Sequence, residues 1–225
     1  GTGRHTGQKG TLNFNPAPEH HGIKFRRVDI EGQPIVEARV ENVVDTSRGT
    51  TIAQNGVCVY TVEHILASVR GAGIDNILID INCEEPPIQD GSAKNMIETL
   101  KSAGIVEQNA EREYLRINKE VKYINEKIGA EITIVPADDF RMEVSVDYNS
   151  KVLKPQTAVL EDMSDFEKEI APCRTFVFFH ELEMLLKYNL IKGGDLSTAI
   201  VFVEGCVGEE ELQRVAKLFN MESVG

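Results

Sequence analysis

A carboxylate and an imidazole stand side by side as Glu63 and His64, within the stretch YTVEHILASVRG of residues 60–71. Imidazole is the commonest metal ligand in proteins, and a carboxylate beside an activated water can take its proton. Adjacent helical residues point about 100° apart, so the two side chains can flank one site without sharing one ligand position. Taken alone, the pair is better explained by a capping Glu and a packed His, and it needs further support before a metal-assisted hydrolytic site is inferred.

The sequence around the pair has the periodicity of an amphipathic helix, which we predict over residues 61–72. Its apolar stripe has the i, i+3, i+4, i+7 spacing of a helix that faces a core, and consists of Val62, Ile65, Leu66 and Val69. The opposite side carries His64 together with three small residues, Ala67, Ser68 and Gly71. A solvated side would usually carry charged residues there. We therefore expect this side to face another layer of the protein or a cleft, with Glu63 and His64 projecting into it.

Four other stretches contain residue types that suit ligand binding: GRHTG (3–7), DTSRGTT (45–51), EPPIQDGSA (85–93) and RTFVFF (174–179). The first places His5 among glycines, where a ligand can approach the backbone closely. The second could equally be a solvated loop, and the third is typical of a stiff turn that leads into a capped helix. The fourth places Thr175 beside aromatic residues, and its alternative is a core strand.

Composition limits the classes of function. The 225 residues suffice for one large domain or two small ones, and a hydrophobic content of 41% indicates a globular protein. A formal charge of -12 repels nucleic acid and anionic lipid, so we expect no nucleic-acid partner. No apolar run approaches the ~18 residues of a membrane span, so we expect no integral membrane segment. The cysteines form no C-x-x-C pair and lie in apolar surroundings, which predicts buried, reduced thiols in a cytoplasmic protein: Cys58, Cys83, Cys173 and Cys206.

The order of the predicted elements repeats, which indicates an α+β fold made of two similar domains from an internal duplication. The first half contains strands at 12–14, 23–30 and 76–82 and helices at 61–72 and 93–103. The second half contains a strand pair within 131–148, helices at about 160–170 and 180–188, a strand at 199–203 and a helix at 209–219. GAGIDNILIDI in the first half parallels KGGDLSTAIVFV in the second. We place the domains at 1–108 and 109–225; chance similarity between two α+β halves is the alternative.

Several of these stretches, in this order, resemble the UDP-3-O-acyl-N-acetylglucosamine deacetylase family of lipid A synthesis. The matching pieces cover essentially the whole chain: GTGRHTG, PAP…GIKFRR, VVDTSRGTT, TVEHILASVRGAGIDN, EPPIQDGSA, RTFVF and GGDLSTAIV. The resemblance implies two similar α+β domains packed face to face, each a small sheet with two helices, and an active-site cleft between them. It also implies a Zn²⁺ cofactor, held by two His and one Asp, and removal of acetate from the 2-acetamido group of the UDP-sugar.

The resemblance assigns roles to individual positions. His64 corresponds to a zinc ligand, Glu63 to the general base, and Thr175 to the hydrogen-bond donor for the oxyanion. Phe176 corresponds to a residue near the sugar and the start of the acyl chain, and His5 to a supporting position at most. Five further residues match positions that line the family's acyl passage: Leu182, Ile191, Gly194, Leu196 and Ala199.

The remaining ligands of the family lie in a downstream H-K-x-x-D motif, and a further catalytic His follows it. Neither is present in the 225 residues, and none of His5, His20, His21, His64 or His180 completes the family's ligand set. We therefore expect this fragment to be inactive and to lack a tight zinc site, whereas the complete protein is expected to be a zinc-dependent amide hydrolase.

The resemblance also implies the partners. The substrate is expected to be UDP-3-O-acyl-N-acetylglucosamine, and in some members a fatty-acyl dehydratase domain follows on the same chain. Two other functions stay open from the sequence: a zinc amidohydrolase that acts on another acylated sugar, and a non-catalytic module that binds a nucleotide sugar without turnover.

Overall fold

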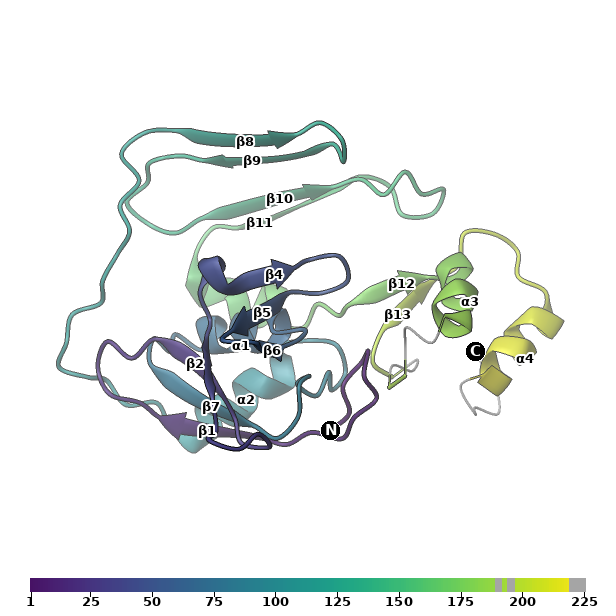
Figure 1. Ribbon diagram of the computed structural model, residues 1–225. Helices are drawn as coiled ribbons and strands as arrows, with labels where there is room; N and C mark the ends of the chain where they lie inside the picture. The colour runs from purple at the N-terminus through teal and green to yellow at the C-terminus, as the bar shows by residue number, and fades with distance from the viewer. Residues whose placement is uncertain (189–191, 194–196, 219–225) are drawn as a thin grey trace.

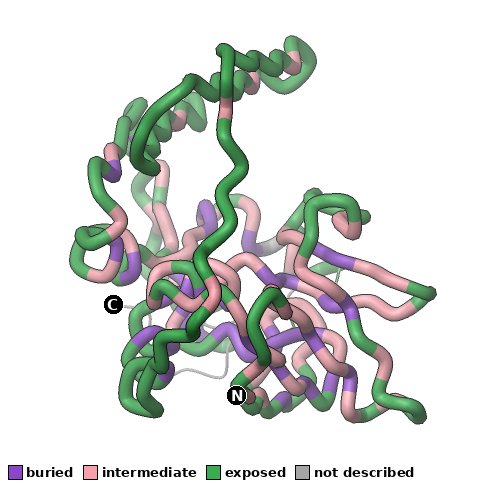
Figure 2. The backbone as a smooth tube through the Cα atoms, turned by 90° about the vertical axis from the view of Figure 1, so that its left-hand side faces the viewer, coloured by how far each residue is buried: buried purple, intermediate pink, exposed green. Residues whose placement is uncertain are grey.

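The computed structural model describes residues 1–188, 192–193 and 197–218 of the chain (Figure 1). The fold is a mixed α+β arrangement of several small sheets and few helices. The N-terminal half is compact, whereas most of residues 104–152 is exposed, as the green tube in Figure 2 shows. None of the described helices has the length and apolar character that crossing a membrane requires.

A four-stranded sheet forms the base of the N-terminal half. Its strands lie in the order β1 (Leu12–Pro16), β7 (Ile77–Ile81), β2 (Ile23–Arg27) and β3 (Ile35–Glu37). β7 runs parallel to β2 and antiparallel to β1, so Ile79 lies between Phe14 and Phe25. The alternation of β7 buries its three isoleucines on one side of the sheet, as the period of two requires. This apolar side forms the main core of the protein.

A second sheet and two helices cover that core. The sheet has the order β4 (Val43–Asp45), β5 (Thr51–Gln54) and β6 (Val57–Val59), and follows the 3₁₀ helix η1 (Val40–Asn42). Asn55 and Gly56 join β5 to β6 with φ of 52° and 80°, the positive values that a two-residue Asn-Gly hairpin turn requires. The helices are α1 (Glu63–Gly71) and α2 (Lys94–Ala103), close to their predicted bounds.

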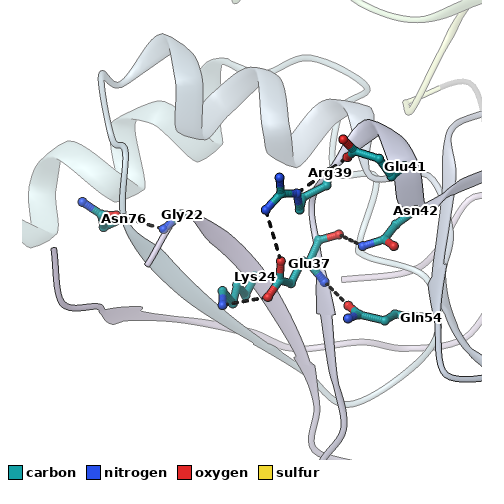
Figure 3. A network of polar contacts seen from close by, with 8 residues as sticks. All are labelled: Gly22, Lys24, Glu37, Arg39, Glu41, Asn42, Gln54 and Asn76. Carbon is teal, nitrogen blue, oxygen red and sulfur yellow. Dashed lines mark hydrogen bonds and ion pairs between the residues drawn. The ribbon is translucent and has the colours of Figure 1, made fainter. Parts of the chain in front are cut away.

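Polar contacts join the edge of the first sheet to the second (Figure 3). The carboxylate of Glu37 accepts a hydrogen bond from Lys24 Nζ at 2.9 Å, and the Glu37 amide donates to the side chain of Gln54 at 3.0 Å. The carbonyl of Glu37 accepts from the side chain of Asn42 at 2.9 Å. Glu37 therefore links β2, β5 and η1 around the end of β3.

The side of α1 that carries the small residues Ala67, Ser68 and Gly71 packs against another layer, as the sequence predicts. Ala67 lies against a cluster of buried residues from α2 and the second half, formed by Ala93, Ile97, Leu160, Phe166 and Ala171. A Cβ atom on Gly71 would lie 2.4 Å from the ring of Phe166. The small residues therefore let the second half approach α1 closely.

The second half begins with two separate hairpins. They are β8 (Val121–Asn125) with β9 (Ala130–Ile134), and β10 (Met142–Val146) with β11 (Gln156–Leu160). β10 lies within the predicted strand pair at 131–148 and β9 begins one residue before it, whereas β8 and β11 lie outside the predicted strands. Figure 1 shows both hairpins standing away from the first half, connected to it by residues 104–120, which form no helix or strand.

The helix expected at about 160–170 is wrong in type. This stretch holds the end of β11, the 3₁₀ turn η2 (Met163–Asp165) and the π-helix η3 (Phe166–Ile170). Asp162 initiates η2 by accepting a hydrogen bond from the amide of Ser164 at 2.7 Å. Phe166 packs under α1 here, a long-range contact that helical periodicity cannot anticipate.

The chain continues into a small parallel pair, β12 (Phe176–Phe178) and β13 (Ile200–Phe202), with α3 (Phe179–Lys187) between the strands and α4 (Glu209–Leu218) after them. The core-strand alternative for RTFVFF is therefore confirmed for Phe176–Phe178. The prediction that all four cysteines are buried is wrong. Cys83 is buried and Cys58 half-buried, but Cys173 and Cys206 are exposed because each lies in a turn or loop outside the packed elements.

Candidate functional site

The start of α1 holds Glu63 and His64. Thr50, from the DTSRGTT loop, contacts this start twice: its carbonyl accepts from the Val62 amide at 3.1 Å, and its amide donates to Glu63 Oε2 at 2.8 Å. Gly49 lies so close that a Cβ atom there would be 3.1 Å from Glu63 Oε1. The loop therefore holds the carboxylate of Glu63 in place through its main chain.

His64 lies beside Glu63 and is half-buried. Burial lowers the pKa of the imidazole, the charges of Glu63 and Asp90 oppose this shift, and the charge of Arg4 adds to it. The lowered pKa favours the neutral imidazole at neutral pH, which is the form that binds a metal. One turn later, Ser68 Oγ donates to the carbonyl of His64 at 2.7 Å.

A buried carboxylate organises the N-terminal loop beside α1. Glu85 is 0% exposed and accepts hydrogen bonds from the His5 amide at 3.0 Å, the Thr6 amide at 2.7 Å and the Thr6 hydroxyl at 2.8 Å. The hydroxyl of Thr61, just before α1, donates to it at 3.0 Å. A Cβ atom on Gly3 would lie 2.6 Å from Glu85 Oε2, so a larger residue there would displace this carboxylate. Glu85 therefore connects residues 3–6 to the start of α1.

Thr175 reaches the same place from the second half. Its Oγ1 accepts a hydrogen bond from Arg4 Nη1 at 2.9 Å, and its amide donates to the carbonyl of Gly91 at 2.9 Å. Gly91 has a φ of +81°, and a Cβ atom there would lie 2.2 Å from the carbonyl oxygen of Thr198 and 2.9 Å from the methyl carbon of Thr175. Glycine is therefore required at the contact between the two halves.

The predicted substrate-binding residues lie farther along the second half. Phe176 is half-buried, with its ring edge-on to those of Tyr148, Phe178 and Phe202 at centroid distances of 5.2, 5.7 and 5.3 Å. Leu182 is buried and packs with Val177 and Val215, and Ala199 is 9% exposed just before β13. Ile191, Gly194 and Leu196 lie outside the described residues. The acyl-passage assignment stays a prediction.

Arg4 links these groups: its guanidinium donates to Thr175 Oγ1, and its charge interacts with Glu63 and His64, as does the charge of Asp90 with His64. His5 takes part through its amide, which Glu85 binds. The sequence arguments missed Arg4, Glu85 and Asp90. All three lie inside GRHTG and EPPIQDGSA, but their types alone could not reveal that they meet, because the contact between Arg4 and Thr175 joins residues 171 positions apart.

These contacts join the motifs that carry the family resemblance, and comparison with known proteins agrees. The family model described as LpxC, UDP-3-O-acyl N-acetylglycosamine deacetylase, matches residues 1–219. The chain belongs to this family. Among relatives named UDP-3-O-acyl-N-acetylglucosamine deacetylase, that of Saccharophagus degradans is 42% identical over 206 residues, which is 89% of this chain and 67% of the relative. That of Pseudomonas entomophila is 40% identical over 219 residues, covering 95% of this chain and 71% of the relative.

Other relatives in the LpxC family are larger. A protein of Bacteroides thetaiotaomicron named "Bifunctional enzyme LpxC/FabZ" is 43% identical over 221 residues, or 98% of this chain. The match covers 48% of that protein, so the chain spans about half the length of the bifunctional relatives it matches.

The described residues fit only part of a zinc site. His64 offers one largely neutral imidazole, and Glu63 and Asp90 are the carboxylates near it. A protein zinc site needs three or four ligands, and across residues 1–188, 192–193 and 197–218 no three His, Cys, Asp or Glu side chains form such a group.

Proposed function

We propose that the complete protein is a zinc-dependent deacetylase that removes acetate from the 2-acetamido group of UDP-3-O-acyl-N-acetylglucosamine, a step of lipid A synthesis. The observation that supports the proposal is the position of Arg4, which donates to Thr175 and whose charge interacts with Glu63 and His64 at the start of α1, in a chain that belongs to this family. His64 is proposed as one zinc ligand, with the remaining ligands outside the 225 residues.

Glu63 is proposed as the general base. Its carboxylate is held by the Thr50 amide, so one oxygen is fixed while the group remains available to take a proton from the attacking water. Thr175 is proposed to donate its hydroxyl proton in a hydrogen bond to the oxygen that becomes negative when water adds to the amide carbon. The two groups come from different halves of the chain, so the reaction would take place where the halves meet.

The domain arrangement follows from the same proposal. We place two similar α+β domains at 1–108 and 109–225, related by duplication, with the active-site cleft between them. Supporting this division, residues 104–120 form an irregular connection between the two parts. Each half also ends in a helix, a strand and a helix, α1–β7–α2 and α3–β13–α4, although β7 pairs with β1 and β2 in the first half whereas β13 pairs with β12 in the second.

The substrate's acyl chain is proposed to contact Phe176, Leu182, Ile191, Gly194, Leu196 and Ala199. Apolar residues suit this task because each buried CH₂ contributes about 0.8 kcal/mol. A cytoplasmic location and a fused fatty-acyl dehydratase domain are further parts of the proposal; the names of the bifunctional relatives support the fusion.

Turnover by the complete protein tests this function. UDP-3-O-acyl-N-acetylglucosamine substrates of different acyl length are assayed for acetate release, beside other acylated amino sugars. Glu63→Gln keeps an acceptor for the Thr50 amide but cannot take a proton, so it should lower kcat by about 10²–10⁴-fold while bound zinc is retained. Glu41→Gln, an exposed carboxylate on η1, is the matched control.

Zinc content is the second readout. His64→Ala should lower the zinc held per chain after dialysis, whereas Glu63→Gln should not. Unchanged turnover in Glu63→Gln would eliminate the general-base role. Full zinc content in His64→Ala would eliminate that ligand, and preference for a different acylated sugar would replace the substrate. Binding of the UDP-sugar without acetate release would favour the non-catalytic module.

A further inference from the structure

The hydrogen bond between Arg4 and Thr175 has a defined direction. A guanidinium group carries only donors, so Arg4 Nη1 donates and Thr175 Oγ1 accepts, at 2.9 Å. A threonine hydroxyl has one proton and two lone pairs. Because one lone pair is occupied by Arg4, rotation of the hydroxyl proton toward Arg4 is disfavoured, and the proton points to another direction.

We propose that Arg4 is a positioning residue, which orients the hydroxyl of Thr175 so that its proton is presented to the oxygen of the reacting carbonyl. This inference rests on the proposed function, in which Thr175 is the donor to that oxygen. A cationic donor also polarises the hydroxyl it binds, because hydrogen bonds in a chain strengthen one another. Arg4 would thus make Thr175 both a better aimed and a stronger donor.

The main chain around Arg4 is held on both sides, which makes such a role physically reasonable. After it, the amides of His5 and Thr6 donate to the buried carboxylate of Glu85. Before it, the Gly3 amide donates to the carbonyl of Gln8 at 2.9 Å. A side chain that starts from a fixed backbone loses less freedom when it binds its partner, so orientation is achieved before substrate arrives.

The second half also holds Arg4. The amide of Gly193 donates to the Arg4 carbonyl at 3.2 Å, and a Cβ atom on Gly193 would lie 2.2 Å from the carbonyl oxygen of Gly3. Residue 4 is thus enclosed by both halves of the chain, while its guanidinium reaches Thr175. Burial lowers the pKa of the Arg4 guanidinium and the charge of Arg48 adds to this, whereas the charges of Glu63 and Glu85 oppose it.

A double-mutant cycle in the complete protein tests the inference. Arg4→Met keeps most of the apolar stem but removes the donor, and Thr175→Val removes the hydroxyl at nearly constant volume. Loss of one oxyanion donor costs about 10²–10³-fold in kcat, and loss of its orientation should cost about tenfold or more. Arg4→Met should lower kcat with little change in KM. Arg4→Lys should retain only part of the parent kcat, because the ammonium group of lysine lacks the planar donor geometry of a guanidinium.

The decisive prediction concerns the double variant. If Arg4 acts through Thr175, then Arg4→Met adds no further loss in a Thr175→Val background, whereas independent roles multiply the two losses. Arg39→Ala is the matched control, since the Arg39 side chain is 65% exposed and its ion pairs with Glu37 at 3.9 Å and Glu41 at 3.6 Å are loose. Thermal unfolding of each variant, with Arg4→Lys as the milder change, separates loss of fold from loss of orientation.

The outcomes are distinguishable. A complete protein that releases no acetate from the UDP-sugar removes the proposed function, and this inference with it. An active protein in which Arg4→Met has normal kcat, raises only KM, or multiplies the loss of Thr175→Val removes the inference alone. A kcat loss in Arg4→Met that disappears in the Thr175→Val background supports it.

Discussion

Removal of the buried carboxylate of Glu85 should destabilise the protein and release its N-terminal loop. Glu85 is 0% exposed and accepts hydrogen bonds from two main-chain amides and two hydroxyls: His5 N, Thr6 N, Thr6 Oγ1 and Thr61 Oγ1, at 2.7–3.0 Å. In Glu85→Ala these donors lose their common acceptor. The hydroxyls can turn toward other acceptors, but the two amides cannot.

The magnitude follows from those two amides. A buried donor left without an acceptor costs about 1–3 kcal/mol, so the two together give a loss of about 4 kcal/mol in the free energy of unfolding. For a domain of this size, that corresponds to a fall of about 8–16 °C in the unfolding midpoint. Glu85→Gln fills the same volume and keeps one acceptor oxygen, so it should lose about half as much.

Urea and thermal unfolding measure the loss, and hydrogen exchange at residues 3–7 measures release of the loop. Glu84→Gln is the matched control. The side chain of Glu84 is only half-buried, and the substitution leaves unchanged the Glu84 carbonyl that accepts from the Tyr60 amide. Glu84→Gln should therefore alter the free energy of unfolding by no more than about 0.5 kcal/mol. If Glu85→Ala unfolds at the same midpoint as Glu84→Gln, or if the amides of residues 3–7 keep their protection, the organising role of Glu85 is refuted.

Two further predictions concern the close contact behind α1 and the response to acid. Gly71→Ala should destabilise the protein by about 1–3 kcal/mol despite the helix propensity of alanine, because the new Cβ would lie 2.4 Å from the ring of Phe166. The control Gly205→Ala has open space around the new Cβ and should be nearly neutral. Equal thermal unfolding midpoints for the two variants would contradict the close packing of Gly71 against Phe166. The hydrogen bond from Arg26 holds the pKa of Asp80 below its ordinary value, so its stabilisation is present above the unfolded value of about 3.9 and is lost as pH falls below it. Asp80→Asn should therefore lose less stability than the parent between pH 5 and pH 2 in urea titrations, and identical pH profiles would show that this pair contributes nothing.

Much of the N-terminal half follows from local sequence rules. The stripe of α1 buries Val62, Ile65 and Val69 as its spacing predicts. The Asn-Gly turn between β5 and β6 and the alternation of β7 follow from backbone preference and the period of a strand. These features appear as local patterns of residue type and spacing, so they can be inferred from the chain alone.

The stretch between β11 and Phe176 was harder to predict because its packing partners lie far away in sequence. Phe166 packs against Gly71, almost a hundred positions earlier in the chain, and η2 and η3 take the place of the expected helix. The predicted burial of Cys173 and Cys206 was wrong for a related reason. An apolar sequence neighbourhood does not bury a residue that the tertiary structure leaves in a turn.

The candidate site also combines features that the sequence predicts with features that only the folded structure shows. Residue types, spacing and motif order were enough to single out Glu63, His64 and Thr175 and to indicate the family of the chain. Only the tertiary structure showed that Arg4 donates to Thr175 and that Glu85 is the buried acceptor behind Arg4, because both depend on long-range contacts. Hydrogen-bond direction and burial are properties of the folded arrangement. A sequence names the groups that are present, while the packing of distant segments decides which of them meet.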